Sequence, residues 1–148
     1  MNINELLPWQ QADFGRWLEA LDTQRLSHGW LLEGTEGIGK RAFAEAAAAS
    51  ALCEQRSAGQ TACGRCIGCQ LLVAGNHPDL VRVRPALLAL AEGMAEDDEG
   101  DDEAGEAAAG DGKKASREIK IQQIRTLGDY AGIASTRGGR RVALVYPA

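Results

Sequence analysis

The stretch from Trp30 to Arg41, W-L-L-E-G-T-E-G-I-G-K-R, decides the fold of this chain, and the alanine-rich run Ala42 to Leu52 follows it directly. A short apolar run, three glycines with a lysine, and then strong helix formers predict a strand, a phosphate-binding loop and a helix. In such a loop, backbone N–H groups and the helix N-terminus cradle an anion while the lysine supplies a point charge. The order therefore predicts an α/β fold whose loop contacts phosphate.

One position of this loop departs from the pattern. Gly34, Gly39 and Lys40 fit the spacing G-x-x-x-x-G-K, with Gly37 between them, but Arg41 stands where a Ser or Thr hydroxyl would hold Mg²⁺. Arginine cannot coordinate Mg²⁺, and its charge competes with the metal for the phosphates. We therefore expect a degenerate nucleotide or phosphate site, with ATP hydrolysis lost and residual ATP binding left open. The alternative is a turn that uses glycine only for backbone freedom.

Length, hydrophobicity and charge restrict the class of protein. A chain of 148 residues with 45% hydrophobic residues predicts one globular domain, residues 1–148. No apolar run approaches the roughly 18 residues of a membrane span. The N-terminus M-N-I-N-E-L-L-P lacks the layout of a signal peptide, so we expect a cytoplasmic protein without membrane contact.

The net charge of −5 is unevenly distributed along the chain. Residues 92–111 hold ten acidic side chains and no basic one, so the remainder carries 16 basic against 11 acidic residues. That remainder is mildly basic, which is compatible with contact to nucleic acid or an acidic partner but demonstrates neither. Residues 92–114 lack aromatic side chains and cannot bury enough apolar surface to offset their ordering entropy, so we expect a disordered acidic insertion. A docking tail or a decoy for DNA is the alternative.

Hydrophobic periodicity predicts further elements on both sides of the loop. Trp9, Phe14, Trp17, Leu18 and Leu21 recur at helical spacing and predict an amphipathic helix with a core-facing side. Residues 80–83 and 142–146 are short apolar runs typical of buried parallel strands, as are residues 29–32. Between them, residues 119–127 place three aliphatic side chains on one helical face. Because a domain does not normally finish on an inner strand, we expect the chain to be a fragment.

Four cysteines, Cys53, Cys63, Cys66 and Cys69, follow the loop helix at the spacing C-x9-C-x2-C-x2-C. In a compartment that keeps thiols reduced, such a set favours metal ligation over disulfides. Four thiolates close a tetrahedral shell around Zn²⁺ and leave no position for catalysis, so residues 53–69 predict an inserted structural zinc module. Two disulfides with three possible pairings, a redox C-x-x-C pair and an iron–sulfur cluster are the alternatives.

The order of these motifs is more specific than any one of them. A strand ending in W-L-L-E-G, a G-x-x-G-x-G-K loop, the cysteine cluster, then G-N-H-P-D at residues 75–79 and I-K-I-Q-Q-I-R-T-L at residues 119–127 resembles the bacterial clamp-loader ATPase-like subunits. The resemblance covers nearly all of the chain except the acidic insertion. It implies a P-loop AAA+ domain, a three-layer fold with a parallel sheet and helices on both faces, and a zinc module inserted after the loop helix.

Within that family, the catalytic positions separate two kinds of subunit. The motor subunit, gamma or tau, has Lys-Thr in its loop and a strand that ends in Asp-Glu. Here Lys40 precedes Arg41, and the strand at residues 142–146 ends in Pro147-Ala148. The chain therefore resembles a member that keeps the fold without ATPase activity of its own. An active motor ATPase and a zinc-ribbon nucleic-acid-binding module are the alternatives.

The resemblance also implies partners. They are the clamp-loader motor subunits (gamma/tau) and delta and, through the complex, the sliding clamp and primer-template DNA. The complex serves DNA replication within the DNA polymerase III holoenzyme, a DNA-directed DNA polymerase and hence a nucleotidyltransferase. The resemblance places the arginine that reaches a neighbour's ATP beyond residue 148.

Overall fold

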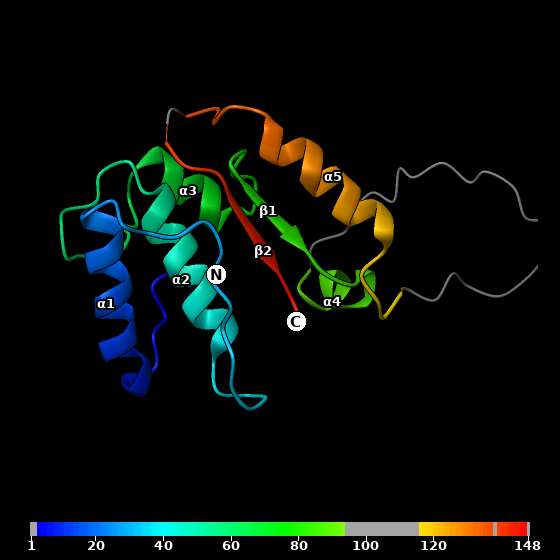
Figure 1. The fold of residues 1–148 in the computed structure, drawn as a ribbon, viewed down its shortest axis with the longest axis horizontal. Coiled ribbons are helices and arrows are strands. Elements are labelled where there is room, and N and C mark those ends of the chain that lie inside the picture. Colours follow the sequence, from blue (N-terminus) through cyan, green and yellow to red (C-terminus); the bar gives the residue numbers. More distant parts are fainter. Residues whose placement is uncertain (1–2, 94–115, 138, 148) are drawn as a thin grey trace, which may run out of the picture.

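The computed structural model describes residues 3–93, 116–137 and 139–147, so most of the predicted acidic insertion lies outside the described residues. Figure 1 shows the arrangement of the elements. In chain order they are the 3-10 helix η1 (Pro8–Gln10), α1 (Gln11–Asp22), α2 (Lys40–Leu52), α3 (Ile67–Val73), β1 (Leu80–Val83), α4 (Ala86–Ala91), α5 (Ile121–Gly132) and β2 (Val142–Val145). None of the helices in these ranges is long and apolar enough to cross a membrane.

The alanine-rich helix α2 lies at the centre of the packing (Figure 1). Alanine favours the helix and keeps its surface slim, so neighbouring elements approach from more than one side. On one side Phe43 meets Phe14 of α1 edge to face, with 5.2 Å between the ring centroids. On another, Ala49 and Leu52 pack in a second apolar cluster with α3. The predicted helix is confirmed, and it carries the glycine loop at one end and Cys53 at the other.

The sheet of the described residues has two parallel strands, with Leu80 opposite Val142 and Val83 opposite Val145. Both strands were predicted and are confirmed. The strand predicted at residues 29–32 is wrong: this segment is extended but makes no strand ladder, and Leu31 is 72% exposed. A strand needs a hydrogen-bonded neighbour, and over the described residues only β1 and β2 provide one for each other. The α/β class is confirmed, but the larger sheet of a three-layer fold is not seen there.

A buried ion pair fastens α2 to the sheet. Glu45 of α2 accepts from Arg82 of β1 through both carboxylate oxygens, at 2.9 and 2.8 Å. Both side chains are nearly inaccessible to solvent. Two parallel N–H···O bonds fix distance and orientation together, so the pair ties α2, which packs against β2, to the neighbouring strand β1.

Asp79, immediately before β1, organises the turn that leads into β2. Its carboxylate is 1% exposed and accepts from the backbone N–H groups of Thr136 and Arg137, at 2.8 and 3.1 Å, and from the Ser135 hydroxyl at 3.0 Å. Burial acts to raise the pKa of Asp79, but these hydrogen bonds outweigh it and hold that pKa below its usual range. The G-N-H-P-D motif thus joins the start of β1 to the chain before β2.

Two predicted helical faces differ from expectation. Trp9 lies in η1, before α1, and is exposed rather than in the core, because its indole N–H donates to the glycine loop instead. Helix α5 forms where predicted, yet Ile121 is 74% exposed and Ile124 is exposed too. The half-buried side of α5 contains Leu127 and Tyr130, because only that side rests on β1.

Candidate functional site

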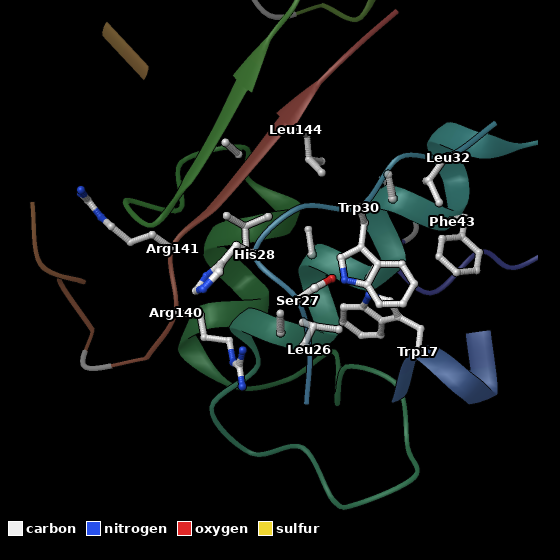
Figure 2. Close-up of a pocket in the computed structure, with 16 residues that line it drawn as sticks. Trp17, Leu26, Ser27, His28, Trp30, Leu32, Phe43, Arg140, Arg141 and Leu144 are labelled. Atoms are coloured by element: carbon white, nitrogen blue, oxygen red, sulfur yellow. The ribbon is translucent and has the colours of Figure 1, made fainter. Parts of the chain in front are cut away.

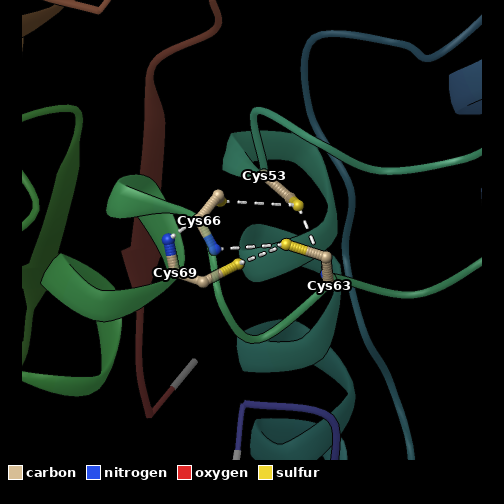
Figure 3. A group of neighbouring side chains, drawn as sticks. All are labelled: Cys53, Cys63, Cys66 and Cys69. Atoms are coloured by element: carbon tan, nitrogen blue, oxygen red, sulfur yellow. Dashed lines mark hydrogen bonds between the residues drawn. The ribbon is translucent and has the colours of Figure 1, made fainter.

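The four cysteines converge from three parts of the chain (Figure 3). Cys53 is the C-cap of α2, Cys66 is the N-cap of α3, Cys69 lies in the first turn of α3, and Cys63 belongs to the loop between the helices. All four sulfur atoms lie within 4.8 Å of one another. The structure therefore brings together the complete set that the spacing predicted.

The distances between the sulfurs fit a tetrahedral metal. Four thiolates around Zn²⁺, each at about 2.3 Å, lie about 3.8 Å from one another. The Sγ atoms of Cys53 and Cys66 are 3.8 Å apart, and those of Cys63 and Cys69 are 3.9 Å apart. A disulfide needs about 2.05 Å, and all four cysteines are free. The geometry of the donor set suits a metal and not a covalent bridge.

Backbone N–H groups already point at three of these sulfurs. Cys63 donates to the Sγ of Cys53 at 3.3 Å, Cys66 to that of Cys63 at 3.4 Å, and Cys69 to that of Cys66 at 3.4 Å. Such donors stabilise thiolates, and N–H groups of Arg65 and Cys66 lower the pKa of the Cys63 thiol to about 6. Burial raises the pKa of the Cys53 and Cys69 thiols.

The two glycines among the cysteines have different roles. Gly64 has a φ of 72°, so it supplies a tight turn between Cys63 and Cys66. Gly68 lies within α3 rather than in a turn, and a Cβ there would be 3.0 Å from the carbonyl oxygen of Leu52. Its small size lets α3 approach the end of α2, which brings Cys69 to Cys53.

The surroundings of the cysteine cluster are apolar. Cys66 and Cys69 are buried in one cluster with Ile3, Ala49, Leu52, Ala62 and Leu72. Cys53 and Cys63 are only partly buried, so the cysteine cluster lies at the edge of this core, with all four sulfurs within reach of one ion. The arrangement is typical of a structural centre that holds α2, α3 and the N-terminal segment together.

The glycine loop is shaped by glycine conformations and by the N-terminal segment. Gly34, Gly37 and Gly39 all have positive φ. A Cβ at Gly39 would lie 2.3 Å from Cδ1 of Leu7, so any other residue would have to displace that side chain and also adopt the φ of 90° that favours glycine. Gln10 donates to the carbonyl oxygen of Gly39 at 2.8 Å, from a position that the sequence did not indicate.

Lys40 folds back onto its own loop. Its Nζ donates to the carbonyl oxygens of Gly34 at 2.6 Å and Thr35 at 3.2 Å. These bonds occupy donors that a phosphate would otherwise receive. The predicted phosphate-binding residues are thus adjacent in space, but the lysine uses two of its three N–H donors within its own loop.

Arg41 points away from the loop toward the ends of the two strands. Its guanidinium is 2.6 Å from Oε1 of Glu92 and lies over the ring of Tyr146, 5.1 Å from the centroid. Arg84, directly after β1, is 3.0 Å from Oε2 of the same glutamate. Arg84, Glu92 and Tyr146 were not among the residues predicted for this site, although the arginine directly after the apolar strand L-V-R-V indicated a charged group at the strand end.

An open groove of about 450 Å³ separates the extended segment before the loop from β2. Figure 2 shows Trp17, Trp30 and Phe43 along one wall, Leu144 of β2 opposite, and arginines at one end. Residues of the segment 26–32 and of β2 line this groove, and in the described residues that segment does not pair with β2.

Comparison with known proteins places this geometry in a family. The family described as DNA polymerase III, delta subunit, matches residues 9–148. The chain belongs to this family. The matched range contains the glycine loop, all four cysteines and both strands, so the two candidate sites are parts of a delta-subunit-family domain.

Relatives in the delta subunit family support the same assignment. The protein called DNA polymerase III subunit delta' in Pseudomonas aeruginosa is 35% identical over 144 residues, which is 97% of this chain and 34% of that protein. Its namesake in Escherichia coli is 36% identical over 78 residues, or 53% of this chain and 23% of that protein. The Bacillus subtilis one is 39% identical over 66 residues. The chain thus spans about a third or less of these relatives.

Proposed function

We propose that this chain is a non-catalytic, delta-prime-type subunit of the clamp-loader complex of DNA polymerase III and that it helps to load the sliding clamp onto primed DNA. The observation that carries the proposal is the ion pair between Arg41 and Glu92 in a chain of the delta subunit family. Arg41 stands where an active ATPase places the hydroxyl that holds Mg²⁺. The arginine instead binds a carboxylate of its own chain.

The loop supports the loss of ATPase activity in two further ways. Phosphoryl transfer depends on a metal ion and on positioned cations that neutralise charge in the transition state. Lys40 donates to carbonyl oxygens of its own loop, and Pro147 follows β2 where a motor subunit has the first acidic residue of its strand end. We infer a P-loop AAA+ ancestry for the fold, with a nucleotide site that has lost its metal-dependent hydrolysis.

We also infer that Cys53, Cys63, Cys66 and Cys69 hold one structural Zn²⁺. When bound, zinc supplies a closed tetrahedral cross-link and no open coordination position. The four cysteines contribute thiolates, the N–H groups stabilise their charge, and the apolar cluster excludes water. The centre thereby fixes the C-terminal end of the loop helix.

The partners follow from the same family assignment. The relatives are named as subunits of DNA polymerase III. We infer that this protein assembles with motor (gamma/tau) and delta subunits, and that it meets the sliding clamp and primer-template DNA within that complex. On this proposal, ATP turnover belongs to the motor subunits.

Reconstitution tests the proposal. Clamp loading by motor and delta subunits should require this protein and should survive Lys40→Ala in it, because the hydrogen bonds of Lys40 in the described part of the chain go to its own loop. The same lysine replaced in the motor subunit is the matched control and should abolish loading. Magnesium-dependent ATP turnover by this protein alone at the rate of the motor subunit would favour the active-ATPase alternative.

A further inference from the structure

A carboxylate is held by two arginines and a tyrosine beside the glycine loop. Oε1 of Glu92 lies 2.6 Å from Nη1 of Arg41, and Oε2 lies 3.0 Å from Nη1 of Arg84. The hydroxyl of Tyr146 donates to the same Oε2, at 3.2 Å. The Arg84 side chain is 2% exposed and that of Glu92 10% exposed. Two cations and a hydroxyl therefore converge on one oxyanion, largely shielded from water.

The three groups that hold this carboxylate come from rigid elements. Arg41 lies in the first turn of α2, Arg84 directly follows β1, and Tyr146 directly follows β2. Arg84 donates to the hydroxyl oxygen of Tyr146 at 2.9 Å, which leaves the hydroxyl proton directed at Glu92. Burial raises the pKa of Tyr146, so this hydroxyl stays protonated at neutral pH. The receptor is therefore built by the loop helix and the sheet.

Glu92 belongs to a different kind of element. It is the C-cap of the six-residue helix α4, which does not contribute to the receptor otherwise. Its single negative charge faces two guanidinium groups, so the cluster formed by Arg41, Arg84, Tyr146 and Glu92 keeps one positive charge in excess. A phosphate carries between one and two negative charges near neutral pH and offers more acceptor oxygens than a carboxylate. Arginine forks match such oxygens well.

We propose that Arg41, Arg84 and Tyr146 form a phosphate-binding site that works without Mg²⁺, and that Glu92 occupies it as an internal competitor. The chemistry is that of a phosphate oxyanion, either free orthophosphate or the terminal phosphate of a nucleotide lying on the adjacent loop. Arginine charge takes the place of the missing metal. The proposal does not depend on clamp loading, because a phosphate can bind here whether or not the protein joins that complex.

Competition between Glu92 and phosphate for Arg41 and Arg84 sets the expected affinity for phosphate. A group tethered in the same chain acts at an effective concentration of the order of millimolar or more, so free phosphate must displace Glu92 before it binds. Glu92→Gln keeps the size of the side chain and removes its charge, and should tighten phosphate binding at least tenfold. Adding Arg41→Ala to this variant should remove the gain, because Arg41 supplies one of the two charges.

Calorimetric titration with orthophosphate at constant ionic strength, with a chelator present, measures this on the complete protein. The matched control is Asp22→Asn, which also removes one arginine-paired carboxylate and changes net charge by one, but at the C-terminal end of α1. ATP and ADP titrated under the same conditions distinguish the two sources. Tighter binding of ATP than of orthophosphate assigns the site to a nucleotide, and the reverse order assigns it to free phosphate.

Several outcomes would overturn the proposal. One is a phosphate affinity of Glu92→Gln that is no higher than that of the parent. Another is an equal gain in phosphate affinity in Asp22→Asn. The third is a gain in Glu92→Gln that persists when Arg41 is replaced as well. If Glu92→Gln fails to fold, the parent protein and Arg41→Ala provide the test, because the Arg41 side chain is 45% exposed and its loss leaves the core intact. High phosphate should then raise the melting temperature of the parent more than that of Arg41→Ala, and equal shifts would refute the site.

Discussion

Replacing Cys69 by serine should separate the metal centre from the packing around it. Cys69 is fully buried and its sulfur lies 3.9 Å from that of Cys63. Serine has nearly the shape of cysteine, is slightly smaller and removes a thiolate, so the tetrahedral shell loses one of its four ligands. We expect the parent to contain one zinc per chain and Cys69→Ser to contain much less than one after dialysis.

The size of the effect follows from mass action. Zinc that binds only the folded chain, at a free concentration about 1,000 times Kd, stabilises it by about 4 kcal/mol. For a domain of this size, each kcal/mol shifts the melting temperature by about 2 to 4 °C or more. Removing the metal or a ligand should therefore lower the melting temperature by about 10 °C. Since protons compete for thiolates, zinc affinity should also weaken as pH falls.

The assay combines elemental analysis, zinc X-ray absorption and thermal unfolding with and without chelator. Absorption should give four sulfur neighbours at about 2.3 Å. Ala62→Ser is the matched control, because Ala62 is buried in the same apolar cluster and the change also introduces a hydroxyl without touching a ligand. The zinc centre would be refuted if freshly reduced parent protein contained no metal, or if its melting temperature were the same with and without chelator. Equal behaviour of Cys69→Ser and Ala62→Ser would refute it as well.

Three further substitutions test the scaffold. Glu45→Ala should destabilise by about 3 to 5 kcal/mol in denaturant unfolding because it leaves Arg82 buried and unpaired, and a cost below about 1 kcal/mol would contradict the buried pair. Asp79→Asn should cost about 1 to 3 kcal/mol at neutral pH. The pKa of Asp79 is lowered in the folded protein. The ionised carboxylate therefore stabilises the fold fully above about pH 4, the ordinary pKa of an aspartate, and this stabilisation is lost as pH falls through the lowered pKa. The Asn variant should lack that acid-dependent loss of stability, and an acid unfolding profile equal to that of the parent would refute this. Gly39→Ala should disorder the glycine loop, because the added Cβ would lie 2.3 Å from Leu7, and unchanged amide protection there would count against it.

The sequence determined the elements that depend on local chemistry. Alanine's helix propensity sets α2, the apolar runs set β1 and β2, and the spacing of the cysteines sets their convergence, because turns between them are short. The glycines at residues 34, 37 and 39 predicted a loop before the helix, and in the structure all three have positive φ. These features depend mainly on residues that are near one another in the sequence, so they can be predicted from the sequence alone.

Only the tertiary structure decided which groups Lys40 and Arg41 contact. Lys40 bonds to its own loop and Arg41 to Glu92, which lies 51 positions later in the chain, and no periodicity links those residues. Residues 29–32 have strand composition, yet they form no strand because a ladder requires a neighbour at hydrogen-bonding distance, and a groove intervenes. Likewise α5 has the pattern of an amphipathic helix, but which side is covered depends on how it lies on β1. Propensity is a property of a segment, whereas pairing and burial are properties of the arrangement.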